Sequence, residues 1–338
     1  MRNLDSIARW LISLLGLIAL IVVVGGVTRL TGSGLSMVDW RPVFGFLPPL
    51  SEAAWQSVFH QYQQFPQFQY VNHTMDLEGF KSIFFWEYLH RVLGRVIGLV
   101  ALIPWLYFWV KGKLTSDFKL KGAVIVLWVV FQGLVGWYMV RSGLVDNPQV
   151  SHYRLALHLS LAFGLFAYIA LLLRQYLYPG AYFKVSTRLK YLCLGLLILV
   201  LFQMEYGAFV AGMKAGYLYP NFPKMGSQWL ASEAHILQPY WRNFFDNPFM
   251  VQFIHRTLGW LVLLGSLGIG LFMSLKEHTD TVFNWFKVYL GLIILQFVLG
   301  VLTLITSVQI VLAVLHQLNA LFLITSLLII VNFSIDKS

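Results

Sequence analysis

Cysteine and charged residues are the scarcest features of this 338-residue chain. Its only cysteine, Cys193, lies in an apolar run, so neither a disulfide nor a cluster of thiolate metal ligands can form within the chain. Cys193 is therefore expected to be a small core residue. Charged residues make up 11% of the sequence and hydrophobic residues 58%, with a mean hydropathy of +0.71, whereas soluble domains carry about 25% charged residues. This composition excludes an ordinary soluble domain and predicts a polytopic membrane protein.

Eight apolar runs are long enough to cross a membrane as helices. The first run lacks an A-x-A-like end, so it is expected to stay in the protein as an uncleaved helix. Thirteen of the 24 Lys and Arg residues lie in terminal segments and short loops on one side of the spans, which places both termini in the cytoplasm. The net charge of +10 thus orients the chain in lipid, and no nucleic acid partner is expected. The predicted spans lie near 7–27, 84–110, 120–140, 153–177, 190–213, 250–273, 287–306 and 311–333.

The two halves of the chain resemble each other, which predicts an all-α protein of two tandem, pseudo-symmetric four-helix bundles, 1–178 and 185–338. Two long outer connections, 28–83 and 214–249, are expected to be ordered loops at the membrane surface. The matched segments are Gly25 to Gly34 with Gly207 to Gly216, and Gln132-x3-Gly136 with Gln296-x3-Gly300.

A dense charged cluster, Glu87-Tyr88-Leu89-His90-Arg91-Val92-Leu93-Gly94-Arg95, opens the second apolar run. Offsets of three and four residues place Glu87, His90, Arg91 and Gly94 on one helical face. Because charge at membrane depth is costly, such a cluster predicts a functional site facing a bundle interior or a cofactor. A weaker copy, Gln252-Phe253-Ile254-His255-Arg256-Thr257-Leu258-Gly259, opens the sixth run.

Four histidines, one in each even-numbered span, are expected about five or six residues inside the outer face, or roughly 8–9 Å deep. The residue four positions after each histidine is small, which leaves a flat slot beside the imidazole. Paired imidazoles beside such slots predict six-coordinate haem iron, and nearby arginines could pair with haem propionates. The histidines are His90, His158, His255 and His316, their small followers Gly94, Ala162, Gly259 and Ala320, and the arginines Arg29, Arg91, Arg95, Arg154 and Arg256.

Other interpretations of the histidines are less favoured. A single membrane histidine is more often a hydrogen-bonded packing residue than a ligand, but four matched ones indicate ligation. Zinc would need further ligands that the second half does not offer at a fitting spacing. The remaining histidines are expected to be solvated loop residues: His60, His73, His152, His235 and His278.

The halves differ where Glu87 precedes His90, because Gln252 holds the matching place before His255. A carboxylate beside one haem site predicts chemistry there, and electron transfer or structural support at the other site. The alternative is an ion pair from Glu87 to Arg91 that only neutralises a buried charge.

Several motifs spread over nearly the whole chain resemble the haem A synthase family, membrane enzymes that convert haem O to haem A for cytochrome oxidase assembly. The long outer connections are similar to those of the branch found in mitochondria and related bacteria. Some bacterial members carry a cysteine pair in the first outer loop, which this chain lacks. The motifs are Gly25-Gly26-x-Thr28-Arg29-Leu30-Thr31-x-Ser33-Gly34-Leu35-Ser36, Trp40-x-Pro42, Glu87-Tyr88-x-His90-Arg91-x-x-Gly94-Arg95, Gln132-Gly133-x-x-Gly136-Trp137-x-Met139-Val140-x-Ser142-Gly143-Leu144, Arg154-Leu155-x-x-His158-Leu159, His255-Arg256 and His316-Gln317.

The resemblance implies a catalytic Glu87 in the first half, where substrate haem O is oxidised at one methyl group through two hydroxylations, with water as the oxygen source. It implies a resident haem b in the second half. It also implies a bacterial cytoplasmic (inner) membrane location, with a haem O synthase and an unidentified electron acceptor as candidate partners and a homo-oligomer left open. The expected substrate-haem residues are His90, His158, Arg91, Arg95, Arg29, Gly94 and Ala162, and the expected haem b residues are His255, His316, Arg256, Gly259 and Ala320.

Two other classes of protein were weighed. A b-type transmembrane electron-transfer cytochrome, such as a quinol oxidoreductase, needs ligands near both membrane faces, whereas all four histidines here are expected near one. A transporter is expected to show broken helices and inverted repeats around a midplane site. Neither feature is evident in the sequence.

Overall fold

The computed structural model describes residues 4–39, 47–180, 186–276 and 280–333, and within these ranges the regular elements are helices. Eight of them are long and apolar enough to span a membrane, which confirms the predicted fold class for the described part of the chain. These helices are α1 (Ser6–Leu30), α4 (Leu77–Val110), α5 (Ser116–Arg141), α6 (His152–Leu177), α7 (Thr187–Gly212), α9 (Pro248–Lys276), α10 (Asp280–Ile305) and α11 (Ile310–Phe333).

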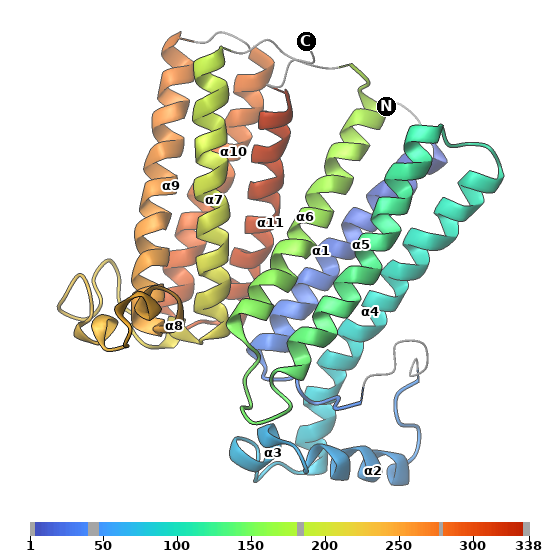
Figure 1. The fold of residues 1–338 in the computed structure, drawn as a ribbon, viewed down its shortest axis with the longest axis vertical. Coiled ribbons are helices and arrows are strands. Elements are labelled where there is room, and N and C mark those ends of the chain that lie inside the picture. The colour runs from blue at the N-terminus through green and yellow to red at the C-terminus, as the bar shows by residue number, and fades with distance from the viewer. Residues whose placement is uncertain (1–3, 40–46, 181–185, 277–279, 334–338) are drawn as a thin grey trace. The chain divides into compact units, whose positions relative to one another are not determined.

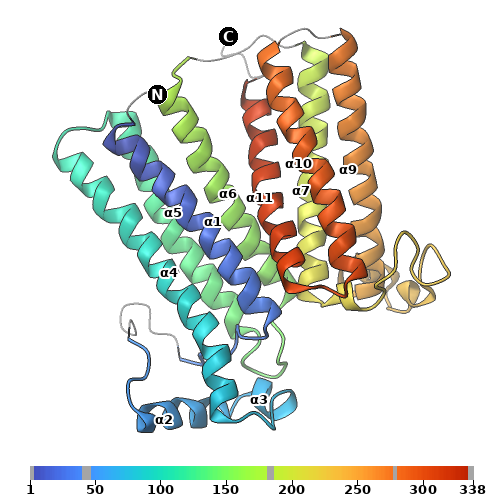
Figure 2. The same cartoon turned by 180° about the vertical axis from the view of Figure 1, so that it is seen from behind.

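The helices form two compact units, residues 1–165 and 166–338, with the boundary inside α6. In the first unit α4 packs against both α1 and α5. In the second unit α7, α9, α10 and α11 form a ring in which each helix packs against two others. Opposite views in Figure 1 and Figure 2 show the helices of each unit running side by side. The assignment of separate roles to 1–178 and 185–338 stays a prediction.

Local capping fixes where several spans begin. The side chains of Asp5, Asp76, Thr115 and Ser186 each accept a hydrogen bond from the backbone N–H three residues further on, at 2.8–3.3 Å. Each contact satisfies one of the N–H groups that a helix start leaves without an intrahelical acceptor. Short polar side chains in front of apolar runs therefore set the starts of α1, α4, α5 and α7.

The helix α4 begins at Leu77, earlier than the start near residue 84 that hydropathy predicted. Its first turns pack against α2 (Glu52–Tyr62) and α3 (Pro66–Tyr70), as Figure 1 shows. Phe80 and Tyr62 are fully buried there, with ring centroids 5.1 Å apart. The first outer connection is thus an ordered helical layer on the end of α4. Trp40 and Pro42 of this connection lie outside the described residues.

The second outer connection is held by two buried asparagines. The Asn243 amide donates to the carbonyls of Leu237 and Tyr240, both at 2.9 Å, and the Asn247 amide donates to the Glu233 carbonyl at 2.8 Å. These bonds satisfy backbone groups that have no regular partner in a loop. The short elements of this connection are η1 (Ala215–Tyr217), η2 (Ser232–His235), η3 (Tyr240–Arg242) and α8 (Asn243–Asp246).

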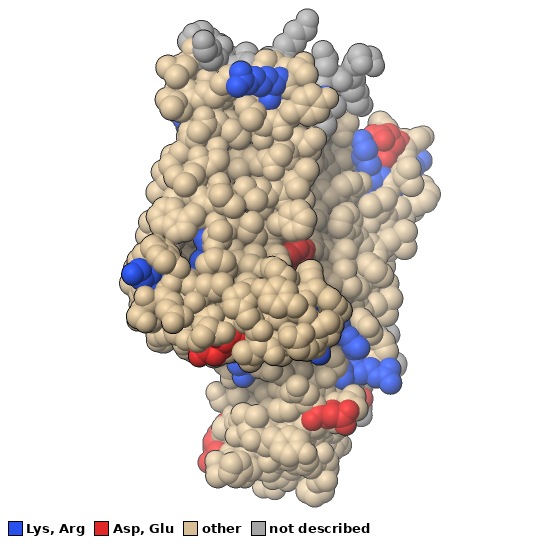
Figure 3. All heavy atoms as spheres, turned by 60° about the vertical axis from the view of Figure 1, so that its left-hand side comes forward, with Lys and Arg blue, Asp and Glu red and all other residues tan. Residues whose placement is uncertain are grey.

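The outer surface of the spans is apolar. On the face shown in Figure 3, charged side chains are sparse and a broad area is uncharged. Leu264 and Leu271 on α9 are examples of large apolar residues that are more than half exposed. Such helix flanks suit contact with lipid tails, where every backbone polar group is already bonded within its helix. Cys193 is fully buried in α7, as its apolar surroundings predicted. The chain is therefore a multi-pass membrane protein.

Candidate functional site

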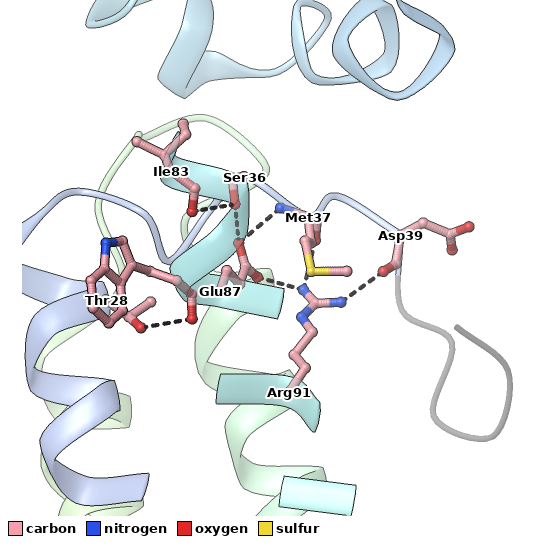
Figure 4. A network of polar contacts seen from close by, with 8 residues as sticks. Thr28, Ser36, Met37, Asp39, Ile83, Glu87 and Arg91 are labelled. Atoms are coloured by element: carbon pink, nitrogen blue, oxygen red, sulfur yellow. Dashed lines mark hydrogen bonds and ion pairs between the residues drawn. The ribbon is translucent and has the colours of Figure 1, made fainter. Parts of the chain in front are cut away.

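Glu87 is the most tightly held carboxylate among the described residues of the first unit. Its side chain is almost fully buried, and Figure 4 shows it at the meeting point of α4 with the segment after α1. The Ser36 hydroxyl and the Met37 backbone N–H both donate to Oε2 at 2.8 Å. The Arg91 guanidinium donates to Oε1 at 2.6 Å. These three donors engage both carboxylate oxygens and hold the side chain in one orientation.

Arg91 links this carboxylate to the loop. Its guanidinium also donates to the carbonyl oxygens of Met37, at 2.6 Å, and Asp39, at 2.8 Å, as Figure 4 shows. The ion pair between Glu87 and Arg91 that the helical spacing predicted is therefore present. It does more than neutralise charge, because the same arginine fastens the residues after α1 to α4. Binding of a propionate by Arg91 stays a prediction.

The second unit repeats the arginine contact. Arg256 donates to the carbonyl oxygens of Tyr219, at 2.6 Å, and Asn221, at 2.8 Å. The glycine repeat in the sequence aligns Tyr219 with Met37 and Asn221 with Asp39. Each unit thus fastens the segment after its first span to its second span through matched backbone carbonyls.

The two contacts differ at the residue before the histidine. Gln252 is buried like Glu87, but its amide donates to the Tyr219 carbonyl at 3.3 Å. The second unit therefore places a neutral donor where the first unit places a carboxylate with three donors. At this position only the first unit has a negative charge, that of Glu87, which could stabilise a cation.

A glycine lies against each of the four predicted ligand histidines, on the span that precedes it. A Cβ built on Gly25 would lie 3.0 Å from His90 Nε2. In the other three pairs the nearest ring atom is Cε1, at 2.9–3.0 Å. The Gly300 distance is shorter than real Cβ atoms show, and the other three are tighter than most real Cβ contacts, so a side chain at any of the four would make the imidazole or the helix shift. The other pairs are Gly136 with His158, Gly207 with His255, and Gly300 with His316.

The histidines are brought together in pairs within the units. His90 interacts electrostatically with His158, and His255 with His316. Each of the four histidines is intermediate in burial. Among the described residues there is no group of three or more His, Cys, Asp or Glu that could hold a metal ion. Two imidazoles in each unit are a ligand set that six-coordinate haem iron uses.

Hydrogen bonds from glutamine residues reach two of the histidines. Gln132 Nε2 donates to the His158 backbone carbonyl at 2.8 Å and lies 3.2 Å from its Nδ1. His316 Nδ1 lies 3.1 Å from the Gln296 backbone carbonyl, and its Nε2 lies 3.3 Å from the Gln296 amide nitrogen. Such contacts set which ring nitrogen carries hydrogen and hold the ring in place.

The small residues expected beside the histidines differ in what lies near them, and their place beside a haem stays a prediction. A Cβ on Gly94 would meet only Ile21, at 3.8 Å, and one on Gly259 would lie 3.4 Å from the Gln203 amide. Ala162 and Ala320 are half-buried. The neighbour of Gly94 in the first unit is therefore apolar, and the neighbour of Gly259 in the second unit is polar.

The other predicted arginines occupy separate positions. Arg29 lies in the last turn of α1, and Arg95 lies one turn after Arg91 on α4. Arg154 donates to the Tyr138 carbonyl at 2.8 Å and its guanidinium lies over the Tyr138 ring, 3.7 Å from the centroid. His158, His255 and His316 lie in the first three turns of their helices, whereas His90 lies further along α4 because that helix starts early.

Sequence reasoning missed several of these partners. The four glycines opposite the histidines were visible as repeated spacings, but their contacts with imidazoles were not anticipated. Ser36 belongs to one of the sequence motifs, but its hydrogen bond to Glu87 was not predicted. Glu205 in α7, a carboxylate inside a span, was not singled out, although ionisable residues at membrane depth are a known signal of function. His278 lies outside the described residues.

Comparison with known proteins finds relatives over nearly the whole chain. The family model for the cytochrome oxidase assembly proteins COX15-CtaA matches residues 8–328. A protein of Nitrosospira multiformis named heme A synthase is 43% identical over 333 residues, covering 95% of this chain and 91% of its own. Heme A synthases of Flavobacterium psychrophilum and of a Bradyrhizobium species are 40% and 42% identical, each covering 96% of this chain, and 97% and 90% of their own lengths.

Proposed function

Since the chain belongs to the haem A synthase family of cytochrome oxidase assembly proteins, we propose that it oxidises one methyl group of haem O to a formyl group, giving haem A. The observation that carries this proposal is the buried Glu87 carboxylate with its three donors, next to the His90 and His158 pair. The second unit has Gln252 in that place, so it offers two imidazoles without the acid. We assign the first unit to substrate haem O and the second to a resident haem b.

Two hydroxylations account for the atoms. Each adds the oxygen of one water molecule to the methyl carbon and releases two protons and two electrons to an acceptor. The second gives a gem-diol, which loses water to leave the formyl group. Bound haem b supplies one-electron redox chemistry when it is present.

Glu87 suits electrostatic stabilisation in this scheme. The Ser36 hydroxyl and the Met37 N–H occupy one of its oxygens and Arg91 the other, so the side chain is held as a carboxylate in fixed orientation. A fixed negative charge stabilises positive charge that develops at the methyl carbon and so favours the addition of water.

Further features of the proposal concern the surroundings. We place the protein in the bacterial cytoplasmic membrane with both termini in the cytoplasm, although residues 1–3 and 334–338 lie outside the described ranges. Arg29, Arg91 and Arg95 are proposed to face the propionates of substrate haem, and Arg256 those of haem b. Haem O arrives from a haem O synthase, and a separate acceptor takes the electrons.

The test is co-expression with a haem O synthase, followed by chromatography of the extracted haems. Glu87→Gln removes the charge and keeps the size, so haem A should fall by roughly 10²-fold or more while haem b and haem O stay bound. Glu78→Gln is the matched control, because this residue lies on the same helix, is exposed and pairs with Lys81. Undiminished haem A from the Glu87 variant would contradict the role of Glu87. Failure of the unmodified protein to form haem A from haem O would contradict the activity.

A further inference from the structure

The Gln132 side chain of α5 is held in one orientation beside His158. Its Nε2 donates to the His158 backbone carbonyl at 2.8 Å. Turning the amide over would place Oε1 against that carbonyl oxygen, with two acceptors facing each other. Oε1 is buried and has no hydrogen-bond partner among the described residues, so it does not oppose the observed orientation.

This orientation presents an N–H donor to His158 Nδ1, at 3.2 Å. In a neutral imidazole the nitrogen that accepts a hydrogen bond has no hydrogen, so the hydrogen of His158 belongs on Nε2. A histidine that ligates iron through Nε2 must instead carry its hydrogen on Nδ1, usually donated to a carbonyl or carboxylate. Ligation through Nδ1 would compete with the amide for the same lone pair. Gln132 therefore opposes ligation through either nitrogen.

His316 in the second unit also has a glutamine amide beside its ring, but it carries its hydrogen on the other ring nitrogen. Its Nδ1 lies 3.1 Å from the Gln296 backbone carbonyl, which can only accept, so the hydrogen belongs on Nδ1 and the lone pair on Nε2. The Gln296 amide nitrogen lies 3.3 Å from Nε2, and Asn319 holds that amide by donating to Gln296 Oε1 at 2.7 Å, so the amide has to leave this lone pair before iron can bind. The residue at the matching place after His158 is Leu161, which has no such group.

We propose that Gln132 is a positioning residue that makes His158 a labile iron ligand, so that the first unit takes up and releases haem. His316 already carries its hydrogen on Nδ1, as ligation through Nε2 requires, whereas His158 must change tautomer first. This inference rests on the proposed function, because it explains how the first unit exchanges substrate for product. Gln132 acts through His158.

The tautomers give the first test, on haem-free protein labelled with ¹⁵N-histidine. Nitrogen chemical shifts in the unmodified protein should place hydrogen on Nε2 of His158 and on Nδ1 of His316, with His158→Gln and His316→Gln used for assignment. Gln132→Met keeps the length of the side chain and removes the donor, so His158 should gain the Nδ1–H form. Hydrogen on Nδ1 of His158 in the unmodified protein would overturn the proposal.

Haem release gives the second test. Transfer of haem from purified protein to apomyoglobin should be fast for the first unit and slow for the second, with His90→Ala used to identify the first-unit signal. Gln132→Met should slow first-unit release by about 10- to 100-fold, the usual effect of a changed partner behind a metal ligand. The second-unit haem of the same molecules is the internal control for folding and should release at an unchanged rate.

The outcomes separate the two proposals. Unchanged or faster first-unit release in Gln132→Met, with the second-unit haem retained, overturns the role of Gln132 and leaves the proposed function intact. An unmodified protein from haem O-producing cells whose first unit never holds haem contradicts the proposed function itself.

Discussion

Gly300 of α10 lies directly against the imidazole of His316 on α11, so closely that a Cβ at Gly300 would be 2.9 Å from Cε1. The same relationship recurs at the other three histidines. It shows that the ring positions depend on a backbone approach as well as on the histidines themselves.

Replacing Gly300 with alanine should therefore displace His316. Overpacking of this kind costs about 1–3 kcal/mol, which corresponds to roughly 5- to 150-fold weaker haem binding. Haem b per protein, measured by the pyridine haemochrome spectrum, should fall. Gly291→Ala on the same helix is the control, because a Cβ there meets nothing within 4 Å. Equal haem content in both variants would show that the contact is dispensable.

Removing the Ser36 hydroxyl should impair Glu87 without removing it. Ser36→Ala takes one of three donors from the carboxylate, and a hydrogen bond to a charged group contributes about 1.5–3 kcal/mol. Formation of haem A should fall roughly 10- to 100-fold with haem b retained, and Ser36→Thr should restore it. Ser33→Ala removes a buried hydroxyl that bonds to Thr31 instead. If that variant loses as much activity as Ser36→Ala, the effect belongs to the loop rather than to Glu87.

The arginine contacts should hold the outer segments independently of each other. In Arg91→Lys the single ammonium group cannot bond to two carbonyls and the Glu87 carboxylate at once, as the planar guanidinium does. Residues 33–39 should therefore become sensitive to limited proteolysis. Arg256→Lys should expose residues 219–224 in the same way. Each variant serves as the control for the other. Cleavage that appears in both segments of a single variant would mean general unfolding.

The second outer connection should loosen in acid. The pKa of Glu233 lies below its ordinary value of 4.5, because its own backbone N–H and then the Ser232 hydroxyl donate to the carboxylate. A lowered pKa means that the stabilisation is present above about pH 4.5 and is lost as the pH falls through the lower, folded-state value. Hydrogen exchange of residues 231–243 should rise in that window, and Ser232→Ala should move the rise to higher pH. Ser227→Ala, in an exposed part of the same connection, should not move it.

The spans and the carboxylate cluster could be predicted because their causes are local. Apolar runs of spanning length must form helices in lipid, and Glu87 and Arg91 meet because four residues separate them on a helix. The early start of α4 was missed because Phe80 is held by Tyr62, a contact between distant residues that hydropathy does not report.

The environment of the imidazoles could not be predicted for a related reason. The repeats of glycine and glutamine were visible, but which helix faces which depends on packing. The direction of a glutamine amide, as at Gln132, depends on one backbone carbonyl of a neighbouring helix. The guanidinium groups of Arg91 and Arg256 also donate to main-chain oxygens. Because every residue has such an oxygen, no pattern of side chains in the sequence predicts these contacts.

Those guanidinium contacts do not depend on the identity of the loop side chains. Because Arg91 is bonded to the main chain of Met37 and Asp39, and Arg256 to that of Tyr219 and Asn221, residues of quite different character occupy corresponding places under the same fastening. Side chains on the outward side of each loop can therefore change, and bind different partners, while the backbone of the loop stays bonded to its helix.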